Sequence, residues 1–144
     1  MEDFRFFVTI PIRYGDIDAQ RHLNNVAYFT FMEQARVAYL RETGMWRSNR
    51  FDDVGTIVAE ASCRFTAPAY LWDTVTVWMR VTRLGNKSYD CEYRLHTERG
   101  EIAVGRTIQV CYDYTRGKSL PLPDEWREAI TAYEPALETE PAGT

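Results

Sequence analysis

The sequence is poor in the residues that build metal centres and covalent cross-links. Its 144 residues include three cysteines and two histidines. Three cysteines cannot all pair within one chain, and Cys63, Cys91 and Cys111 lack Cys-x-x-Cys spacing, so we expect reduced thiols and a cytoplasmic location. Neither His22 nor His96 has a second ligand at metal-binding spacing, so the sequence predicts no metal site.

The motifs of several common protein classes are absent too. The sequence has no Gly-x-Ser-x-Gly elbow, no P-loop and no Gly-x-Gly-x-x-Gly fingerprint, which argues against an α/β-hydrolase and the common nucleotide-binding folds. No apolar run approaches the ~20 residues of a membrane span, and Arg5, Thr9 and Pro11 interrupt the segment where a signal peptide would be apolar. We therefore expect no membrane insertion. The net charge of −4 argues against nucleic acid as a partner, although local Lys and Arg residues can still bind an anionic ligand.

The composition predicts one folded domain. A chain of 144 residues with 45% hydrophobic and 14% aromatic residues is long and apolar enough to bury a core. No repeat and no long linker marks a second unit. We expect a single domain over residues 1–134 and a frayed tail over 135–144.

Hydrophobic periodicity predicts a strand followed by a long helix. Residues 4–14 alternate between apolar and polar side chains, which is typical of a half-buried strand. Residues 26–40 form a long apolar segment, which Asn24 or Asn25 can cap and Gly44 can end. Apolar residues surround this helix almost entirely, so we expect it to be buried on most sides.

Four further strands follow without a helix between them, and a short helix starts near Pro123. Short connections at 85–87 and 99–100 predict antiparallel neighbours. We expect an antiparallel meander that packs one face on the long helix, which makes an α+β domain. The expected strands are 56–67, 73–83, 88–98 and 101–113, with apolar faces formed by Ile57, Ala59, Ala61, Cys63 and Phe65; by Val75, Val77, Met79 and Val81; by Tyr89, Cys91, Tyr93 and Leu95; and by Ile102, Val104, Ile108, Val110 and Tyr112.

The residues that can carry chemistry are concentrated just before the long helix. Asp16, Asp18, His22, Asn24 and Asn25 lie within ten positions. A helix N-terminus offers unpaired N–H groups and a partial positive charge that suit an oxyanion, and a carboxylate just upstream can attack a carbonyl or activate water. The spacing alone leaves a second interpretation open, since Asp and Asn before a helix also serve as caps and turn residues.

The segment 13–36 resembles the signature of the hot-dog thioesterase superfamily, in particular the hydroxybenzoyl-CoA thioesterase and bacterial acyl-CoA thioester hydrolase branch. The shared pattern is Asp-x-Asp, His-x-Asn-Asn, a Tyr in the first helical turn, and then Glu and Arg. Downstream segments 65–69 and 120–123 agree with it. The resemblance implies a hot-dog fold, in which a five-stranded antiparallel sheet wraps around a long central helix and a short C-terminal helix follows. The motif residues here are Asp16, Asp18, His22, Asn24, Asn25, Tyr28, Glu33 and Arg36.

The resemblance also implies roles at the reacting centre. It places the catalytic carboxylate at Asp18, the oxyanion donor at the Asn25 backbone N–H, and an orienting group at His22. Asp16 is expected to stabilise the loop.

Substrate contacts are implied further along the chain. Tyr28 and Glu33 are expected on the substrate side, although Glu33 can also simply pair with Arg36 one turn on. Coenzyme A is expected at the turn between the two middle meander strands. That coenzyme A set is Gly85, Asn86, Lys87 and Ser88, with Arg64 and Arg83 as outer phosphate contacts.

The implied reaction is hydrolysis of an acyl-CoA to a free acid and coenzyme A, with no cofactor beyond the coenzyme A of the substrate itself. An acyl-carrier-protein thioesterase and a non-catalytic acyl- or CoA-binding module stay open as alternatives. An enoyl-CoA hydratase is disfavoured, because three residues instead of four separate Asp18 from His22 and the Gly-Asp-x-Asn-Pro context is missing. The family forms dimers with the site at the subunit interface, so we expect a homodimer or homotetramer. Short, medium, long and aromatic acyl groups all remain open.

Overall fold

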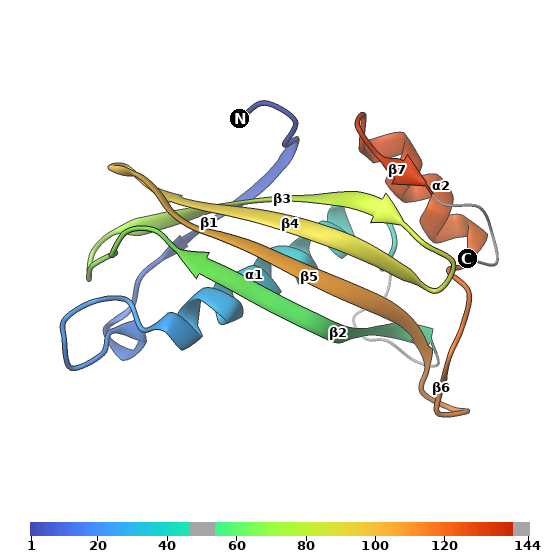
Figure 1. The fold of residues 1–144 in the computed structure, drawn as a ribbon, viewed down its shortest axis with the longest axis horizontal. Coiled ribbons are helices and arrows are strands. Elements are labelled where there is room, and N and C mark those ends of the chain that lie inside the picture. The colour runs from blue at the N-terminus through green and yellow to red at the C-terminus, as the bar shows by residue number, and fades with distance from the viewer. Residues whose placement is uncertain (47–53, 140–144) are drawn as a thin grey trace.

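The computed structural model describes residues 1–46 and 54–139 and contains one antiparallel sheet with a long helix on one face (Figure 1). The main strands lie in the order β1-β3-β4-β5-β2, with short β6 beside β5 and short β7 parallel to β3. The α+β hot-dog class that the sequence predicts is confirmed. The strands are β1 (Phe6–Pro11), β2 (Val54–Phe65), β3 (Thr74–Leu84), β4 (Ser88–Thr97), β5 (Gly100–Asp113), β6 (Lys118–Ser119) and β7 (Glu138–Thr139), and the helices are the short 3-10 helix η1 (Tyr14–Asp16), α1 (Asn25–Glu42) and α2 (Asp124–Tyr133).

Helix α1 begins and ends as the sequence predicts but is less enclosed. Asn24 is its N-cap and accepts a hydrogen bond from the Val26 N–H (3.1 Å), while Gly44 follows its last turn in the left-handed conformation that glycine favours. The expectation of burial on most sides is wrong for the outer side of the helix. Only one face packs on the sheet, and Val26 and Phe29 are exposed on the other.

The predicted meander of four consecutive strands is wrong for its first strand, β2. Strands β3, β4 and β5 are sequential neighbours, but β2 pairs with β5 at one edge and β1 pairs with β3 at the other. The connection from β2 to β3 therefore crosses the full set of intervening strands instead of forming a hairpin. This crossing carries residues 66–73 past the N-terminal end of α1 (Figure 1).

Two of the predicted apolar faces are also wrong, and irregular pairing explains both. The pairing of β4 with β5 skips Ile102, so beyond that point the side chains facing α1 are Gly105, Thr107 and Gln109 instead of the valines and isoleucines. A Cβ atom at Gly105 would lie 2.6 Å from the Met32 sulfur, so a side chain there would force the Met32 side chain to move. In β2 a similar register shift between Val58 and Glu60 splits the predicted set, and Ile57 and Phe65 are exposed at this edge strand. The faces predicted for β3 and β4 are confirmed, and so is the alternation over β1, but Tyr14 at the end of the predicted strand 4–14 lies in η1 and is exposed.

The end of the sheet at the β3–β4 turn is closed by the C-terminal segment. Arg127 of α2 donates hydrogen bonds to the carbonyls of Gly85 and Asn86. The buried Glu134 carboxylate accepts from the Tyr39 hydroxyl and from the Val81 N–H (3.0 Å). Part of the predicted frayed tail is ordered here, since residues 138–139 pair with β3, while residues 140–144 lie outside the described residues. We call this the closed end.

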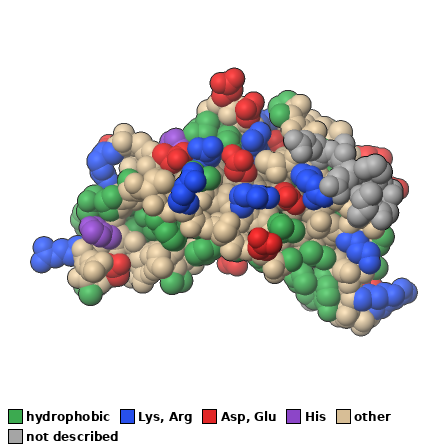
Figure 2. All heavy atoms as spheres, viewed as in Figure 1, with side chains coloured by type: hydrophobic (Ala, Val, Ile, Leu, Met, Phe, Trp, Pro, Cys, Tyr) green, Lys and Arg blue, Asp and Glu red, His purple; other side chains and the backbone are tan. Residues whose placement is uncertain are grey.

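The outer face of the sheet carries opposite charges side by side (Figure 2). Arg94 pairs with Glu101 (2.9 Å) and Arg106 pairs with Asp90 (3.2 Å) across neighbouring strands. Such partly exposed pairs add little stability, but they cover the sheet with groups that bind water. Within residues 1–46 and 54–139, no helix is both apolar enough and long enough for a membrane span.

Candidate active site

A short loop before α1, residues 17–23, carries the motif residues Asp18 and His22 and is closed by backbone contacts. Ile17 and Leu23 form an isolated antiparallel bridge across its base. The Asp18 N–H donates to the His22 carbonyl (2.9 Å), and the Arg21 N–H donates to the Asp18 carbonyl (3.0 Å). Arg21 is left-handed, with φ 68°, an uncommon conformation for a residue with a side chain. We call this segment the pocket loop.

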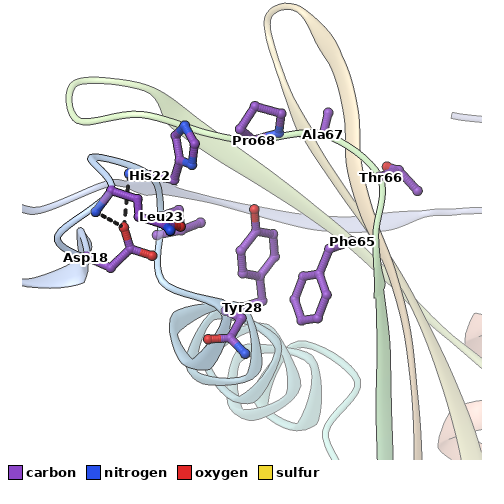
Figure 3. A pocket seen from close by; sticks show the side chains of 10 residues that line it. Asp18, His22, Leu23, Tyr28, Phe65, Thr66, Ala67 and Pro68 are labelled. Carbon is purple, nitrogen blue, oxygen red and sulfur yellow. Dashed lines mark hydrogen bonds between the residues drawn. The ribbon is translucent and has the colours of Figure 1, made fainter.

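The Asp18 carboxylate is held by the backbone of its own loop. Its Oδ1 accepts hydrogen bonds from the N–H groups of Gln20 (2.9 Å) and His22 (3.3 Å). None of the described residues donates a hydrogen bond to Oδ2, and Figure 3 shows the side chain at the edge of a pocket. One oxygen thus fixes the orientation of the carboxylate, and the other is available to a bound molecule.

The neighbouring Asp16 does a different job. Its carboxylate is buried and accepts hydrogen bonds from the Arg13 backbone N–H (2.9 Å) and from the Arg13 guanidinium (3.1 and 3.3 Å). Burial on its own would raise the pKa of Asp16, but the hydrogen bonds and charge of Arg13 outweigh it and lower the pKa below its usual value. The Asp16 carbonyl accepts from the Asn24 N–H (2.8 Å), so Asp16 connects the strand end to the helix cap, as a loop-stabilising residue should.

The N-terminus of α1 faces the same pocket. Asn25 is the first helical residue, and its backbone N–H has no acceptor among the described residues. The side chain of Asn24 caps the following N–H, that of Val26, and leaves the Asn25 group available. A free N–H at the positive end of an 18-residue helix is well suited to bind an oxyanion.

The pocket has a volume of about 490 Å³ and one polar and one apolar wall. The apolar wall includes Tyr28 and Phe65, whose rings meet edge to face with centroids 4.8 Å apart (Figure 3). Burial raises the pKa of the Tyr28 hydroxyl, which therefore stays protonated and can donate a hydrogen bond at neutral pH. The lining residues are Asp18, Gln20, His22, Leu23, Asn25, Tyr28, Phe65, Thr66, Ala67 and Pro68.

His22 lines the pocket, but its imidazole is directed toward an aromatic neighbour. Its ring lies 5.4 Å from the ring of Tyr70, edge to face. Its contact with the Asp18 carboxylate is made by the backbone N–H and not by the ring. Pocket walls formed by residues 65–68 were not assigned from the sequence. Their only signal was their place in the family resemblance, because a crossover connection reveals its spatial neighbours only in the folded chain.

Glu33 is placed away from the Asp18 pocket. Its side chain is 68% exposed and lies 3.9 Å from Arg36, as the simple pairing predicts. Glu33 lines a separate groove of about 370 Å³ along the outer side of α1, with Thr30 and Val37. Of the two residues predicted on the substrate side, the structure brings only Tyr28 to Asp18.

The predicted coenzyme A turn lies at the closed end, away from the pocket of its own chain. Strand β3 has 11 residues, so the turn that follows it is roughly 30 Å from the pocket end of the sheet. Arg83 pairs there with Asp90 (3.5 Å), whereas Arg64 is exposed at the other end of the sheet, next to Phe65 of the pocket wall. The turn backbone is held by the Gly85 N–H to Ser88 carbonyl bond (2.7 Å) and by the Leu122 N–H to Asn86 carbonyl bond (2.9 Å).

No cluster of three or more His, Cys, Asp or Glu side chains suited to a metal ion occurs in the part of the chain that the structure describes. All three cysteines are free thiols, and Cys91 and Cys111 are buried. The groups available for chemistry at the pocket are therefore a carboxylate, a phenol, an imidazole and a helix N-terminus.

Comparison with known proteins identifies the family of the chain. The family model of the thioesterase-like superfamily matches residues 12–130. The long-chain acyl-CoA thioesterase FadM of Escherichia coli (strain K12) is 27% identical over 123 residues, which cover 84% of this chain and 93% of FadM.

Two solved structures are similar over nearly the whole chain. The PA5185 protein of Pseudomonas aeruginosa strain PAO1 has a TM-score of 0.84 at 30% identity, covering 95% of this chain and 96% of that protein. A thioesterase of Thermus thermophilus, crystallised with coenzyme A and Zn, has a TM-score of 0.78 at 29% identity, covering 92% of this chain and 96% of its own.

Proposed function

We propose, since the chain belongs to the thioesterase-like superfamily, that it hydrolyses acyl-CoA thioesters to a free acid and coenzyme A. The observation that carries the proposal is the pairing of a half-free carboxylate, Asp18, with a free N–H at the start of α1 on one pocket. A thioester needs both a nucleophile or base and a site for its carbonyl oxygen, and the pocket presents one of each.

The chemistry uses the groups in the following way. The thioester oxygen accepts a hydrogen bond from the Asn25 N–H, and the helix dipole favours the negative charge that develops on it. Oδ2 of Asp18 either adds to the carbonyl carbon, forming a mixed anhydride that water then cleaves, or takes a proton from the water that adds. In both routes the C–S bond breaks, the sulfur leaves as the thiolate, and the acid product keeps the new oxygen. A single turnover in isotopically labelled water tests direct attack: if water cleaves the anhydride at the Asp18 carbonyl, the first acid released carries an unlabelled Asp18 oxygen and the label enters Asp18, whereas water activated by Asp18 puts the label in the acid.

His22 positions the carboxylate in this scheme. Its backbone N–H binds Oδ1 of Asp18, and its ring is packed against Tyr70. Tyr28 lines the same pocket, where its hydroxyl can donate a hydrogen bond to the thioester or to the amide groups of the pantetheine arm. Neither role requires a metal or a cofactor beyond the coenzyme A of the substrate.

The name of FadM supports a CoA thioester with an apolar acyl group, and the Tyr28–Phe65 wall is compatible with such a group. A carrier-protein thioester presents the same pantetheine arm and is the second candidate. The free thiols fit a cytoplasmic enzyme, the location that we propose.

A second copy of the chain completes the proposed enzyme as a dimer or tetramer. Strand β2 is an edge strand with exposed Ile57 and Val58, and the outer side of α1 exposes Val26 and Phe29. Such an edge is a template for pairing with another strand. Antiparallel pairing of β2 with its copy would reverse the sheet direction, so the closed end of one copy would lie toward the pocket of the other. That arrangement is what the predicted coenzyme A contacts at residues 85–88 require.

The test is thiol release by the wild-type protein from short, medium, long and aromatic acyl-CoAs and from the matching carrier-protein thioesters. We expect turnover of at least one acyl-CoA, and the preferred chain identifies the acyl class. Turnover of carrier-protein substrates alone would favour the second candidate. Tight binding of acyl-CoA without turnover of any thioester would contradict the proposal and identify a binding module.

A further inference from the structure

The turn that follows the pocket wall presents a tryptophan to solvent in a strained conformation. Trp72 is 88% exposed, the highest value among the exposed large hydrophobic residues, and its φ is 79°. It is the third residue of a turn closed by the hydrogen bond from the Asp73 N–H to the Tyr70 carbonyl (3.0 Å). A positive φ at this position defines a type II turn, where glycine or asparagine is the usual residue.

The turn on either side of Trp72 is fixed by hydrogen bonds and an ion pair. The Asp73 carboxylate accepts a hydrogen bond from the Tyr70 N–H (2.8 Å) and forms an ion pair with Arg99. The Asp73 carbonyl accepts from the Ile12 N–H (2.9 Å), which ties the turn to the end of β1. Local structure therefore needs a left-handed residue here but does not need an indole. A strained backbone conformation held in place by its surroundings, at a residue whose indole the turn does not need, points to a functional contact.

The turn, residues 70–73, lies directly beyond the wall of the Asp18 pocket in the sequence, and we call it the lip. Residues 65–68 line the pocket and lead directly into it, and Figure 3 shows Pro68 beside His22 at the rim. The Tyr70 ring packs against His22 and is itself 41% exposed, and the Arg99 guanidinium lies 5.2 Å from the centre of that ring. Trp72 is thus two residues beyond a side chain that contacts the pocket.

Two cations lie at the same end of the sheet. Arg21 is exposed on the pocket loop, and Arg64 is exposed next to Phe65 of the wall. Neither forms an ion pair within residues 1–46 and 54–139, in contrast to Arg13 and Arg99 nearby. This end of the sheet therefore combines a flat apolar ring with guanidinium groups that have no carboxylate partner among the described residues.

We propose that Trp72 stacks on the adenine base of the coenzyme A whose thioester occupies the Asp18 pocket. The inference rests on the proposed function, and it places the adenine on the same chain as the pocket, in place of a contact at residues 85–88 of a second copy. An indole stacks on a nucleobase through its face and tolerates solvent on the other side, which fits the high exposure of Trp72. Arg21 and Arg64 supply positive charge for the phosphates between the adenine and the pantetheine arm.

The test separates the nucleotide from the rest of the substrate. The variants are Trp72→Gly, which suits the left-handed position, and Trp72→Phe, which keeps an aromatic ring. Phe7→Ala is the control, because Phe7 is another exposed aromatic residue but lies on β1, away from the lip. Each is assayed with an acyl-CoA and with the same acyl group on pantetheine, which has no nucleotide.

We expect Trp72→Gly to raise the KM for acyl-CoA about tenfold and to leave kcat and the KM for acyl-pantetheine unchanged. Trp72→Phe should recover most of the affinity, and Phe7→Ala should match the wild type. An equal KM for acyl-CoA in Trp72→Gly and wild type would overturn the stacking proposal. An equal rise in KM for acyl-CoA and acyl-pantetheine would overturn it too. If carrier-protein thioesters are assayed as well, a rise in KM for them alone would identify Trp72 as a protein-docking residue and would also overturn the proposal.

Calorimetric binding of free coenzyme A keeps this result distinct from failure of the proposed function. Weaker binding of coenzyme A to Trp72→Gly than to the wild type would support the stack even in a protein that hydrolyses no thioester. Equal binding to the two proteins, or no binding to the wild type, would contradict it.

Discussion

The two ends of the sheet are built for different purposes. At the closed end two polar side chains tie the C-terminal segment to the sheet: Glu134 receives hydrogen bonds from Tyr39 and Val81, and Arg127 binds the carbonyls of the β3–β4 turn. At the pocket end Asp18 has a free oxygen and Asn25 a free N–H, as far as the described residues go. The free groups of the pocket end lie where a substrate can satisfy them, whereas the buried Gln109 side chain near the closed end has no hydrogen-bond partner among the described residues.

Backbone strain follows the same division. Arg21 and Trp72, two of the three left-handed residues that are not glycine in the described part of the chain, both lie at the pocket end. Strained backbone persists only where its surroundings fix it, and here a bridged loop and a clamped turn do so. We infer that stability is concentrated at the closed end and recognition at the pocket end, and the predictions below test that division.

The largest effect is expected from removing the free N–H at the helix start. Asn25→Pro eliminates this donor at the first helical position, where proline is well tolerated. The Asn24 backbone, with ψ 136°, is already in the region that precedes proline. We expect kcat to fall by about 10²–10³ with little change in the free energy of unfolding. Asn25→Ala keeps the N–H and should stay within a few-fold of wild type, so similar losses in both variants would contradict the assignment.

The closed end should respond in stability and not in catalysis. Tyr39→Phe removes one of the two hydrogen bonds to the buried Glu134 carboxylate. We expect a loss of about 2 kcal/mol in the free energy of unfolding, measured with denaturant. Turnover per folded molecule should remain that of the wild type. A loss of turnover without a loss of stability would contradict the assignment of stability to the closed end and of catalysis to the pocket end.

The strain at Trp72 can be measured by comparing two variants that both lack the indole. At φ 79° glycine is unstrained and alanine is not, so Trp72→Gly should be about 1 kcal/mol more stable than Trp72→Ala. The preceding turn residue, Leu71, has no positive φ and provides the control. At that position the alanine variant should be at least as stable as the glycine variant, and the same order at both positions would show that Trp72 is not strained.

The smallest effects are expected in pH dependence, and they have opposite signs at the two ends. The hydrogen bond from Arg99 lowers the pKa of Asp73, so its contribution to stability is present above the unfolded pKa and is lost as pH falls through the folded pKa. Burial raises the pKa of Glu134 above 4.5, so its contribution is present below the unfolded pKa and is lost as pH rises through the folded pKa. We expect the Asp73→Asn variant to lose less stability than the wild type as the pH falls, and the Glu134→Gln variant to lose less as the pH rises. Thermal unfolding of both variants across pH 2–7 measures this. Parallel profiles for both variants and the wild type would contradict these assignments.

Much of the fold was predictable because local patterns decide it. The alternation in β1, β3 and β4 and the caps of α1 are short-range features, and the structure confirms them. The faces of β2 and β5 were not predictable, because single-residue irregularities reverse the alternation without any local sign in the sequence. The position of β2 beside β5 depends on a crossover that only tertiary packing selects.

The candidate site was predictable in part for the same reason. Asp18, His22, Asn25 and Tyr28 lie within eleven positions of the sequence, and the structure brings them to one pocket. The opposing wall at residues 65–68 and the lip at Trp72 come from a segment much later in the chain. The predicted coenzyme A turn stays a prediction that needs a second copy, and Glu33 lies on another groove.

The most direct test of the account is the acyl-CoA hydrolysis rate of Asp18→Asn beside that of Glu33→Gln. Asparagine keeps the size of the side chain and one oxygen for the loop N–H groups, so the fold should be retained. The account predicts a loss of about a hundredfold or more in kcat for Asp18→Asn and near wild-type turnover for Glu33→Gln. Full activity in a folded Asp18→Asn variant, or collapse only in Glu33→Gln, would contradict it and move the chemistry to the outer groove of α1.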